Sequence, residues 1–278
     1  IYSENKIYGK IYSILLKSYF NKAEKTIVPS KGICNDLITN FKIKKERIFI
    51  INNPYDIEKT RQLSKKSIEP EILDKFKGSF IITVGRLTTV KGYKYLINII
   101  KLIKEKYKKD IKLVIIGEGD LYENLLDLVK NLNIKENIMF LGFKRNPYKY
   151  ISRALLYIMS SLYEGFPNVL VESLICGVPV ISTDCNTGPR EILAPDTDFR
   201  FRTKSIEYAK YGVLVPPFKK KFQPGIYSKE EYIMADAIMS LLNNKRKSEY
   251  YKKIGIKRAN VLETKKIIKQ YKEVILNA

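Results

Sequence analysis

The sequence predicts an α/β fold, in which a Rossmann-like parallel sheet is wound with helices. The evidence is an alternation of short apolar runs with helical patterns between residues 79 and 183, since strands that alternate with helices form parallel sheets. Four of the five runs in this stretch end at Gly or Ser. We therefore expect strands at 80–85, 111–117, 138–142, 155–160 and 178–183, and a sixth at 212–216.

The segments between these runs carry apolar side chains at helical spacing. The first such pattern extends from Tyr95 to Ile103 and the second from Leu121 to Leu132. Three more helical patterns follow the sheet, at 229–243, 245–260 and 263–276. A sheet of this kind binds ligands at the carboxyl ends of its strands, so the loops that follow the strands should share one rim.

A shorter unit precedes the sheet, with a strand at 26–31, a helix at 32–41 and a strand at 47–52. It is too short to close a domain of its own. Residues 53–56, Asn-Pro-Tyr-Asp, favour a linker, because the residue before Pro resists helix and because Asn, Asp and Pro favour turns. At 278 residues the chain exceeds the usual size of one domain, and we divide it into 1–56, 57–260 and 261–278.

Composition narrows the classes of partner. The chain carries 51 basic and 29 acidic residues, a net charge of +22, which suits nucleic acid, an anionic membrane or a negatively charged substrate. Lys, Ile, Asn and Tyr are abundant along the whole chain, however, which indicates a general compositional bias. No RNA-binding motif, zinc-finger spacing or basic helix ahead of a heptad repeat occurs, so we expect no nucleic-acid partner.

The cysteines and the apolar segments bear on location. Three unevenly spaced cysteines without a Cys-x-x-Cys pair argue against a disulfide framework or a zinc site. Neither a membrane-length apolar run nor a signal-peptide pattern is present, so we expect a cytoplasmic protein. The basic, Tyr-rich segment 8–22 favours an ordinary packing helix, with peripheral contact to the inner face of the cell membrane as the alternative. The chain opens with Ile1 rather than Met, which leaves open that it is a piece of a longer protein.

Glu164 and Glu172, separated by seven residues, form the most informative pair in the chain. Pro167 suits the start of a helix and Gly177 its end, so Glu164 lies in the preceding loop and Glu172 lies one turn above Asn168. The two carboxylates then converge on the start of the helix. Free N–H groups there attract anions, and carboxylates accept hydrogen bonds from hydroxyls, so a diphosphate flanked by two polyols fits both features.

The loop from Gly85 to Gly92 follows the first strand of the sheet and precedes a helix, the context of a phosphate-binding loop. Gly85 allows a tight turn, while Arg86 offers a forked cation and Lys91 a compact one for a diphosphate. A basic pair in a loop is usually solvated surface. The second anion-compatible feature at the same rim favours a functional interpretation.

Two other patterns are weaker. Gly117 and Gly119 lack the third glycine of a dinucleotide fingerprint, because Tyr122 stands in its place. Asp196 and Asp198 have the spacing of a divalent-metal site, but a solvated turn explains them better, and we expect no metal ligands.

The segment 187–192 leaves two alternatives open. Either Arg190 or Glu191 lies near a substrate, or the segment is a capped helix start. The chain contains no His, which excludes Ser-His and Cys-His nucleophile systems. A general base is therefore a carboxylate or belongs to a part of the protein outside this sequence.

Taken as a set, these motifs come in the order and spacing that resembles the family 4 retaining glycosyltransferases, from about Thr26 onward. The motifs are those at 85–92, 117–119, 164–172, 177–183 and 188–192. The resemblance implies the GT-B fold of two Rossmann domains, with the sugar donor held by the C-terminal domain. Under this resemblance, residues 1–56 are the end of the acceptor-side N-terminal α/β domain, which is only partly present, together with the linker. The nucleotide-sugar-binding C-terminal domain is 57–260. The last helix, in 261–278, crosses back to the first domain.

Roles for individual residues follow from the resemblance by motif match. Arg86 and Lys91 would hold the diphosphate and stabilise it as it leaves, the work that a metal ion does elsewhere. Glu164 would bind hydroxyls of the transferred sugar.

The other donor-binding residues are Gly85, which shapes the phosphate loop, and Gly165 and Phe166, whose backbone N–H groups would meet donor oxygens. Glu172 would bind the ribose hydroxyls. The resemblance places the nucleotide base near 142–145.

The resemblance implies transfer of a hexose or N-acetylhexosamine to a glycan or lipid-linked acceptor in cell-surface polysaccharide synthesis, with retention and without a metal. A UDP-sugar is favoured as donor over GDP-mannose, and no separate cofactor is implied. Only the last strands and helix of the first domain are present, so this chain is expected to be the donor-binding portion. The alternative is a non-catalytic nucleotide-sugar-binding or scaffold protein.

Overall fold

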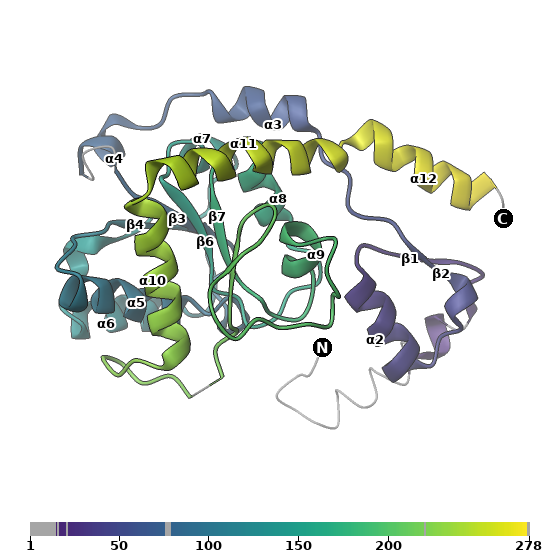
Figure 1. The fold of residues 1–278 in the computed structure, drawn as a ribbon, viewed down its shortest axis with the longest axis horizontal. Coiled ribbons are helices and arrows are strands. Elements are labelled where there is room, and N and C mark those ends of the chain that lie inside the picture. The colour runs from purple at the N-terminus through teal and green to yellow at the C-terminus, as the bar shows by residue number, and fades with distance from the viewer. Residues whose placement is uncertain (1–14, 16, 21, 76–78, 220, 277–278) are drawn as a thin grey trace.

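The computed structural model describes residues 15, 17–20, 22–75, 79–219 and 221–276, and two sheets organise them (Figure 1). The larger sheet has seven strands in the order β5-β4-β3-β6-β7-β9-β8, and the smaller one pairs β1 with β2. Every strand pair is parallel except β8 with β9. The predicted α/β fold with a parallel sheet wound by helices is confirmed.

The strands of the large sheet lie within the six expected runs, with trimmed ends. They are β3 (Ile81–Val84), β4 (Leu113–Ile116), β5 (Ile138–Phe140), β6 (Leu156–Met159), β7 (Val180–Thr183) and β9 (Val213–Val215). The sequence did not predict β8 (Glu207–Tyr208), because two residues carry no strand pattern and the strand exists through its antiparallel pairing with β9.

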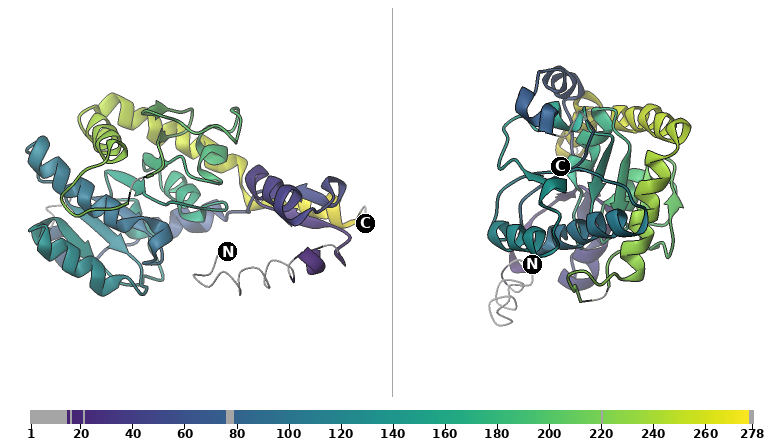
Figure 2. Two further views of the ribbon diagram at one scale, coloured as in Figure 1. Left: turned by 90° about the horizontal axis from the view of Figure 1, so that it is seen from below. Right: turned by 90° about the vertical axis from the view of Figure 1, so that its left-hand side faces the viewer.

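Helices cover both faces of the large sheet (Figures 1 and 2). Successive side chains of β3 point to opposite faces: Ile81 packs in one core and Ile82 in the other. This burial on both sides explains why the strands are apolar throughout rather than alternating. One core includes side chains of α5 (Tyr93–Lys106), α6 (Tyr122–Asn131) and α10 (Lys229–Leu242). The other includes side chains of α3 (Ile57–Ser64), α7 (Tyr148–Ile151), α8 (Asn168–Ile175), α9 (Pro189–Leu193) and α11 (Lys245–Val261), and α4 (Pro70–Lys75) follows α3 along the chain.

The small unit consists of β1 (Thr26–Val28), α2 (Lys31–Phe41) and β2 (Ile48–Ile50), the strand, helix and strand that the sequence predicts. Its own core is small and includes Leu37 and Phe41. The C-terminal helix α12 (Thr264–Leu276) leaves the large unit and lies beside this one (Figures 1 and 2), where Lys25 Nζ donates to the Val274 carbonyl at 2.7 Å. Most of segment 8–22, with its packing and membrane alternatives, lies outside the described residues.

The two places where the chain passes between the units meet at Tyr55. The Tyr55 N–H donates to the Leu262 carbonyl at 3.1 Å, and its carbonyl accepts from the Thr264 N–H at 3.0 Å. The predicted linker is therefore extended at Tyr55, and Asp56 caps α3 by accepting from the Lys59 N–H. Within the described ranges no helix is long and apolar enough to cross a membrane.

Gly92 joins the loop after β3 to α5 and sits against the end of β6. Its φ is +66°, and a Cβ there would lie 2.1 Å from the Ser160 carbonyl oxygen. Only glycine fits this approach, which holds the 85–92 loop against β6.

We predict that Gly92→Ala destabilises the protein more than Gly225→Ala does. Gly225 has a similar φ of +71°, but a Cβ there would meet nothing closer than Leu132 Cδ2 at 3.9 Å. The control therefore carries only the left-handed penalty of about 1–2 kcal/mol. Gly92→Ala adds an overpacking cost of about 1–3 kcal/mol. Urea unfolding of the two variants measures the difference, and equal losses would show that the Gly92 contact is not tight.

Candidate active site

A cavity of about 290 Å³ opens where β3 and β6 end side by side. Its walls come from the ends of these strands, the loop before α5, and the first turn of α8. This is the carboxyl edge of a parallel sheet, where the sequence predicted a shared rim.

Lys91 and Glu164 meet in this cavity. Lys91 Nζ lies 2.7 Å from Glu164 Oε1, and the two side chains are 31% and 10% exposed. The Ser161 hydroxyl donates to the same Oε1 at 2.6 Å. The pair is a charge-assisted hydrogen bond between two loops that are far apart in sequence, so the predicted cationic and acidic motifs do share one site.

Backbone contacts hold these two loops together. The Leu162 N–H donates to the Val90 carbonyl at 2.7 Å, and the Ser160 hydroxyl donates to the Lys91 carbonyl at 2.9 Å. The position of Lys91 is thus set by the end of β6 as well as by its own loop.

Two buried tyrosines form the inner wall of the cavity. The Tyr93 hydroxyl donates to the Gly85 carbonyl at 2.7 Å, and the Tyr157 hydroxyl donates to the Val84 carbonyl at 3.4 Å. Burial, together with the charge of Glu164, raises the pKa of Tyr93. The pKa of Tyr157 is also raised; burial is the largest cause, and the charges of Glu164 and Glu172 both raise it further. Both carboxylates therefore lie close enough to Tyr157 to act on its hydroxyl.

Glu172 lies on α8 and accepts from the Tyr148 hydroxyl at 3.1 Å. Burial raises the pKa of Glu172, and the Tyr148 hydrogen bond only partly offsets this. Burial and the Glu172 carboxylate in turn raise the pKa of Tyr148 to about 12, so its hydroxyl remains a donor. Glu172 is a half-buried acceptor with capacity for a further donor.

The helix predicted from Pro167 and Gly177 is present as α8, with Pro167 at the N-cap and Gly177, at φ +70°, just beyond its end. The N-cap residue Pro167 makes no side-chain hydrogen bond to its first turn. Asn168 and Val169, whose N–H groups have no partner within an α-helix, line the cavity. An anion in the cavity would meet the positive end of this helix.

Some of the predicted site residues line the cavity, and others lie next to its lining. Lys91, Glu164 and Phe166 line the cavity. Gly85 directly follows Val84, a residue that lines the cavity. The Gly85 carbonyl accepts the hydrogen bond from the Tyr93 hydroxyl. Gly165 lies between lining residues and faces Ile33 of α2, whose Cδ1 would be 3.2 Å from a Cβ at this glycine.

Arg86 and Glu172 flank the cavity rather than line it. Arg86 follows Gly85 and is exposed, and its side chain makes no hydrogen bond or ion pair with a described residue; its carbonyl accepts from the Thr88 N–H at 2.9 Å. The loop 142–145, where the resemblance places the base, is joined to the neighbouring loop by the Phe143 N–H, which donates to Glu118 Oε1 at 3.1 Å.

The segment 186–188 holds the Glu164 loop in place through backbone hydrogen bonds and close packing. The Glu164 N–H donates to the Asn186 carbonyl at 2.7 Å, and the Thr187 N–H donates to the Glu164 carbonyl at 2.6 Å. Gly188 packs against the same loop, because a Cβ there would lie 2.7 Å from the Gly165 carbonyl oxygen.

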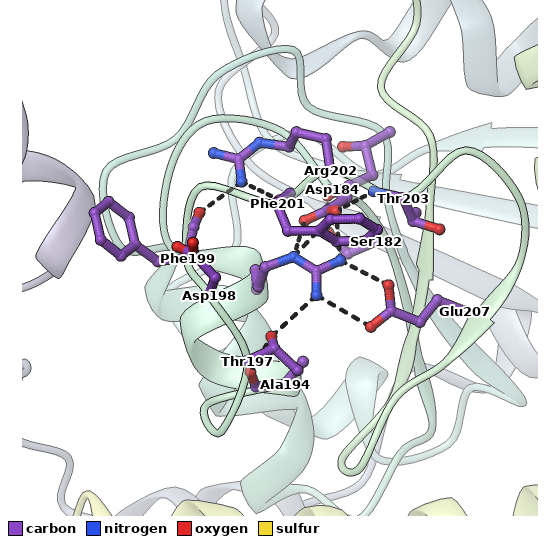
Figure 3. Close-up of polar contacts among 12 residues, drawn as sticks. Ser182, Asp184, Ala194, Thr197, Asp198, Phe199, Phe201, Arg202, Thr203 and Glu207 are labelled. Atoms are coloured by element: carbon purple, nitrogen blue, oxygen red, sulfur yellow. Dashed lines mark hydrogen bonds and ion pairs between the residues drawn. The ribbon is translucent and has the colours of Figure 1, made fainter.

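Arg190 does not line this cavity and belongs to a buried ionic network. Its side chain is 2% exposed and pairs with Asp184 and Glu207, each at 2.6 Å. Thr197 accepts from the same guanidinium at 3.0 Å. Figure 3 labels its three partners, Asp184, Thr197 and Glu207. The segment forms the start of a helix, α9, and Arg190 anchors the loop 194–207 through Thr197 and Glu207.

Glu191 reaches from α9 to the small unit. Its Oε2 accepts from the Lys31 N–H at 2.6 Å and its Oε1 from the Gly32 N–H at 3.0 Å, so it caps α2. Asp196 and Asp198 pair separately, with Lys210 at 2.8 Å and Arg200 at 2.9 Å. In the part of the chain that the structure describes, no three His, Cys, Asp or Glu residues are grouped to hold a metal.

Sequence reasoning missed several residues of the site: Ser161, Tyr93, Tyr157, Tyr148 and Asn168. Ser161 had a signal, because it follows a predicted strand at the ligand-binding edge. Tyr93 had one too, since it directly follows the Gly85–Gly92 loop. Tyr148 had none, because only tertiary packing brings α7 to Glu172.

The comparisons with known proteins identify the family. The model for glycosyl transferases group 1 matches residues 64–211, more than half of the chain. A glycosyltransferase of Methanocaldococcus jannaschii, described as uncharacterized, is 36% identical over 277 residues, which cover 97% of this chain and 67% of that protein. The chain therefore belongs to the group 1 glycosyltransferases, and the predicted family resemblance is confirmed.

Two other proteins are similar. One is the N-acetylgalactosamine-N,N'-diacetylbacillosaminyl-diphospho-undecaprenol 4-alpha-N-acetylgalactosaminyltransferase of Campylobacter jejuni, 37% identical over 196 residues. The match covers 70% of this chain and 51% of that enzyme, so the chain spans about half its length. The other is the crystal structure of Anabaena HepE with UDP and glucose, with a TM-score of 0.78, 19% identity, and coverage of 97% of this chain and 68% of that one. This second likeness shows the GT-B fold.

We predict that Glu172→Gln stabilises the unliganded protein at neutral pH. Burial raises the pKa of this carboxyl above its ordinary value of 4.5, so ionisation costs more in the folded state than in the unfolded one. The associated stability is complete below the ordinary pKa and is lost as the pH rises through the raised one. Gln keeps an acceptor for Tyr148 without the charge. The gain in melting temperature should therefore be largest at pH 7–8 and vanish toward pH 4, whereas a destabilised variant at pH 7 would contradict this account of Glu172.

Proposed function

We propose that this chain binds a UDP-sugar and that the whole protein transfers its hexose or N-acetylhexosamine, with retention, to a glycan or lipid-linked acceptor in cell-surface polysaccharide synthesis. The observation that carries the proposal is the meeting of Lys91 and Glu164 beside the start of α8. A cation, a carboxylate and free N–H groups around one cavity match a diphosphate joined to a sugar.

In this proposal the donor diphosphate lies between Lys91 and the first turn of α8. Lys91 neutralises the charge that develops on the leaving nucleotide, and the exposed Arg86 adds a second cation from the same loop. These two side chains supply the electrostatic stabilisation for which other transferases use a metal ion. Retention and metal independence come from the family resemblance and are part of the proposal.

The sugar lies against Glu164. Its Oε1 is held by Lys91 and Ser161, so its other carboxylate oxygen is available to sugar hydroxyls. The Gly165 and Phe166 N–H groups bind donor oxygens, with the tight turn at Gly85 bordering the diphosphate. Glu172, already oriented by Tyr148, accepts from the ribose hydroxyls, and the base lies near 142–145.

The acceptor binds largely outside this chain. The proposed division is an end of the acceptor-side domain at 1–56, a donor-binding domain at 57–260 and a returning helix at 261–278. The activity for which the Campylobacter relative is named supports a lipid-linked acceptor, and UDP with glucose in the HepE structure supports a UDP-sugar donor. A lipid-linked acceptor would place the protein at the cytoplasmic face of the membrane, in peripheral contact with it.

We predict that UDP and UDP-sugars raise the melting temperature of the chain and that GDP and ADP do not. A ligand present at about 100 times its Kd adds about 2.7 kcal/mol to folding stability. A thermal-shift panel of the three nucleotides and their sugars measures this. A shift with GDP alone would replace the proposed donor, and no shift with any nucleotide would overturn nucleotide-sugar binding.

Comparing Lys91→Met with Lys112→Met shows whether UDP affinity depends on Lys91 itself or only on the loss of one positive charge. Lys112 is a matched control, because it is 20% exposed and pairs with Asp110 at 2.7 Å. A charge-assisted contact contributes about 1.5–3 kcal/mol, so Lys91→Met should weaken UDP binding at least about tenfold. Lys112→Met should leave it unchanged. Equal affinities of the two variants for UDP in a calorimetric titration would show that Lys91 does not bind the donor. UDP binding without sugar transfer by the complete protein would favour the non-catalytic alternative.

A further inference from the structure

Asn168 connects the cavity to the linker between the two units. It is the first residue of α8 and lines the cavity. Its Oδ1 accepts two hydrogen bonds, from Asn53 Nδ2 at 2.7 Å and from the Tyr55 hydroxyl at 2.8 Å. Both donors belong to the 53–56 linker rather than to the donor-binding sheet.

These two bonds fix the orientation of the Asn168 amide. In the structure the carbonyl oxygen of Asn168 faces both linker donors, Asn53 Nδ2 and the Tyr55 hydroxyl. The Asn168 amide nitrogen then faces away from the linker atoms, and no described residue accepts from it. A cavity-lining residue is thus left with two N–H donors that a ligand can use.

Tyr55 is held rigidly on its other side. Its side chain is 6% exposed, and its backbone bonds to Leu262 and Thr264, where α11 passes into α12. Both crossings of the chain between the units therefore meet at the residue whose hydroxyl reaches Asn168. Burial, and then the charge of Glu172, raises the pKa of Tyr55, so the hydroxyl stays protonated and donates.

We propose that Tyr55 and Asn53 are positioning residues for the donor site, acting through Asn168. They orient the Asn168 amide so that its nitrogen donates to a phosphate or sugar oxygen of the bound donor. The inference rests on the proposed function and deepens it, because it makes donor affinity depend on the position of the linker. By linkage, donor binding then holds the linker where it is seen in this structure.

The test compares Tyr55→Phe with Tyr251→Phe. Tyr251 is a matched control: its side chain is 3% exposed, and its hydroxyl donates to the Ala209 carbonyl at 3.1 Å, outside the cavity. Both variants keep the buried ring and lose one hydroxyl, so both should lower the melting temperature by similar amounts. Tyr55→Phe alone should raise the Kd for UDP, by about threefold to tenfold, the range expected for one neutral hydrogen bond.

A second pair of variants tests whether the effect of Tyr55 on UDP affinity passes through Asn168. In the Asn168→Ala protein, which has no amide to orient, adding Tyr55→Phe should leave the Kd for UDP unchanged. The inference is overturned if Tyr55→Phe binds UDP as Tyr251→Phe does, or if its loss of affinity persists in the Asn168→Ala background.

The failure of this inference is distinguishable from that of the proposed function. If the unaltered chain binds UDP and Lys91→Met weakens it, while Tyr55→Phe is neutral, only the linker inference falls. If the unaltered chain binds no UDP, both fall together.

Discussion

The adjacency of β3 and β6 is the constraint on which the site depends. Ile81 pairs with Leu156 and Ile82 with Tyr157 in parallel register, so the two strands end at the same edge. The loops that leave this edge are then neighbours, and Lys91 reaches Glu164 at 2.7 Å although 73 positions separate them in sequence. A parallel strand pair with a shifted register would separate the cation from the carboxylate.

Supporting contacts make this meeting point rigid before any ligand arrives. Gly92 allows the cationic loop to touch the end of β6, while Asn186 and Thr187 hold the Glu164 loop by backbone hydrogen bonds. Behind them, the buried Arg190 network fixes the segment that follows β7 (Figure 3). Breaking such a buried pair leaves an uncompensated charge, so it holds its surroundings firmly. A preorganised constellation of this kind stabilises charge without reorganisation during a reaction.

The sequence predicted the large sheet and the meeting of Lys91 with Glu164 at its edge, because both depend on local patterns. Apolar runs ending at Gly or Ser place the strands, and the rim of a parallel sheet is a fixed consequence of that fold, which is why Lys91 and Glu164 could be assigned to one place. Arg190 could not be resolved from sequence, since only its burial against Asp184 distinguishes an anchor from a ligand-binding arginine. Tyr55 and Tyr148 were missed for a similar reason: their hydroxyls reach Asn168 and Glu172 through packing between separate elements. The roles assigned to the site residues all remain predictions, because they concern a bound donor. These residues are Gly85, Arg86, Lys91, Glu164, Gly165, Phe166 and Glu172.

A crystal structure of the chain with UDP tests the central claim most directly. The diphosphate should lie between Lys91 Nζ and the first turn of α8, with the ribose hydroxyls on the side of Glu172. Another groove offers a comparison, since it is lined by three basic residues, Arg61, Lys65 and Lys266, and by two acidic ones, Glu58 and Glu263. UDP bound in that groove, with the cavity at Lys91 and Glu164 empty, would contradict the assignment of the site.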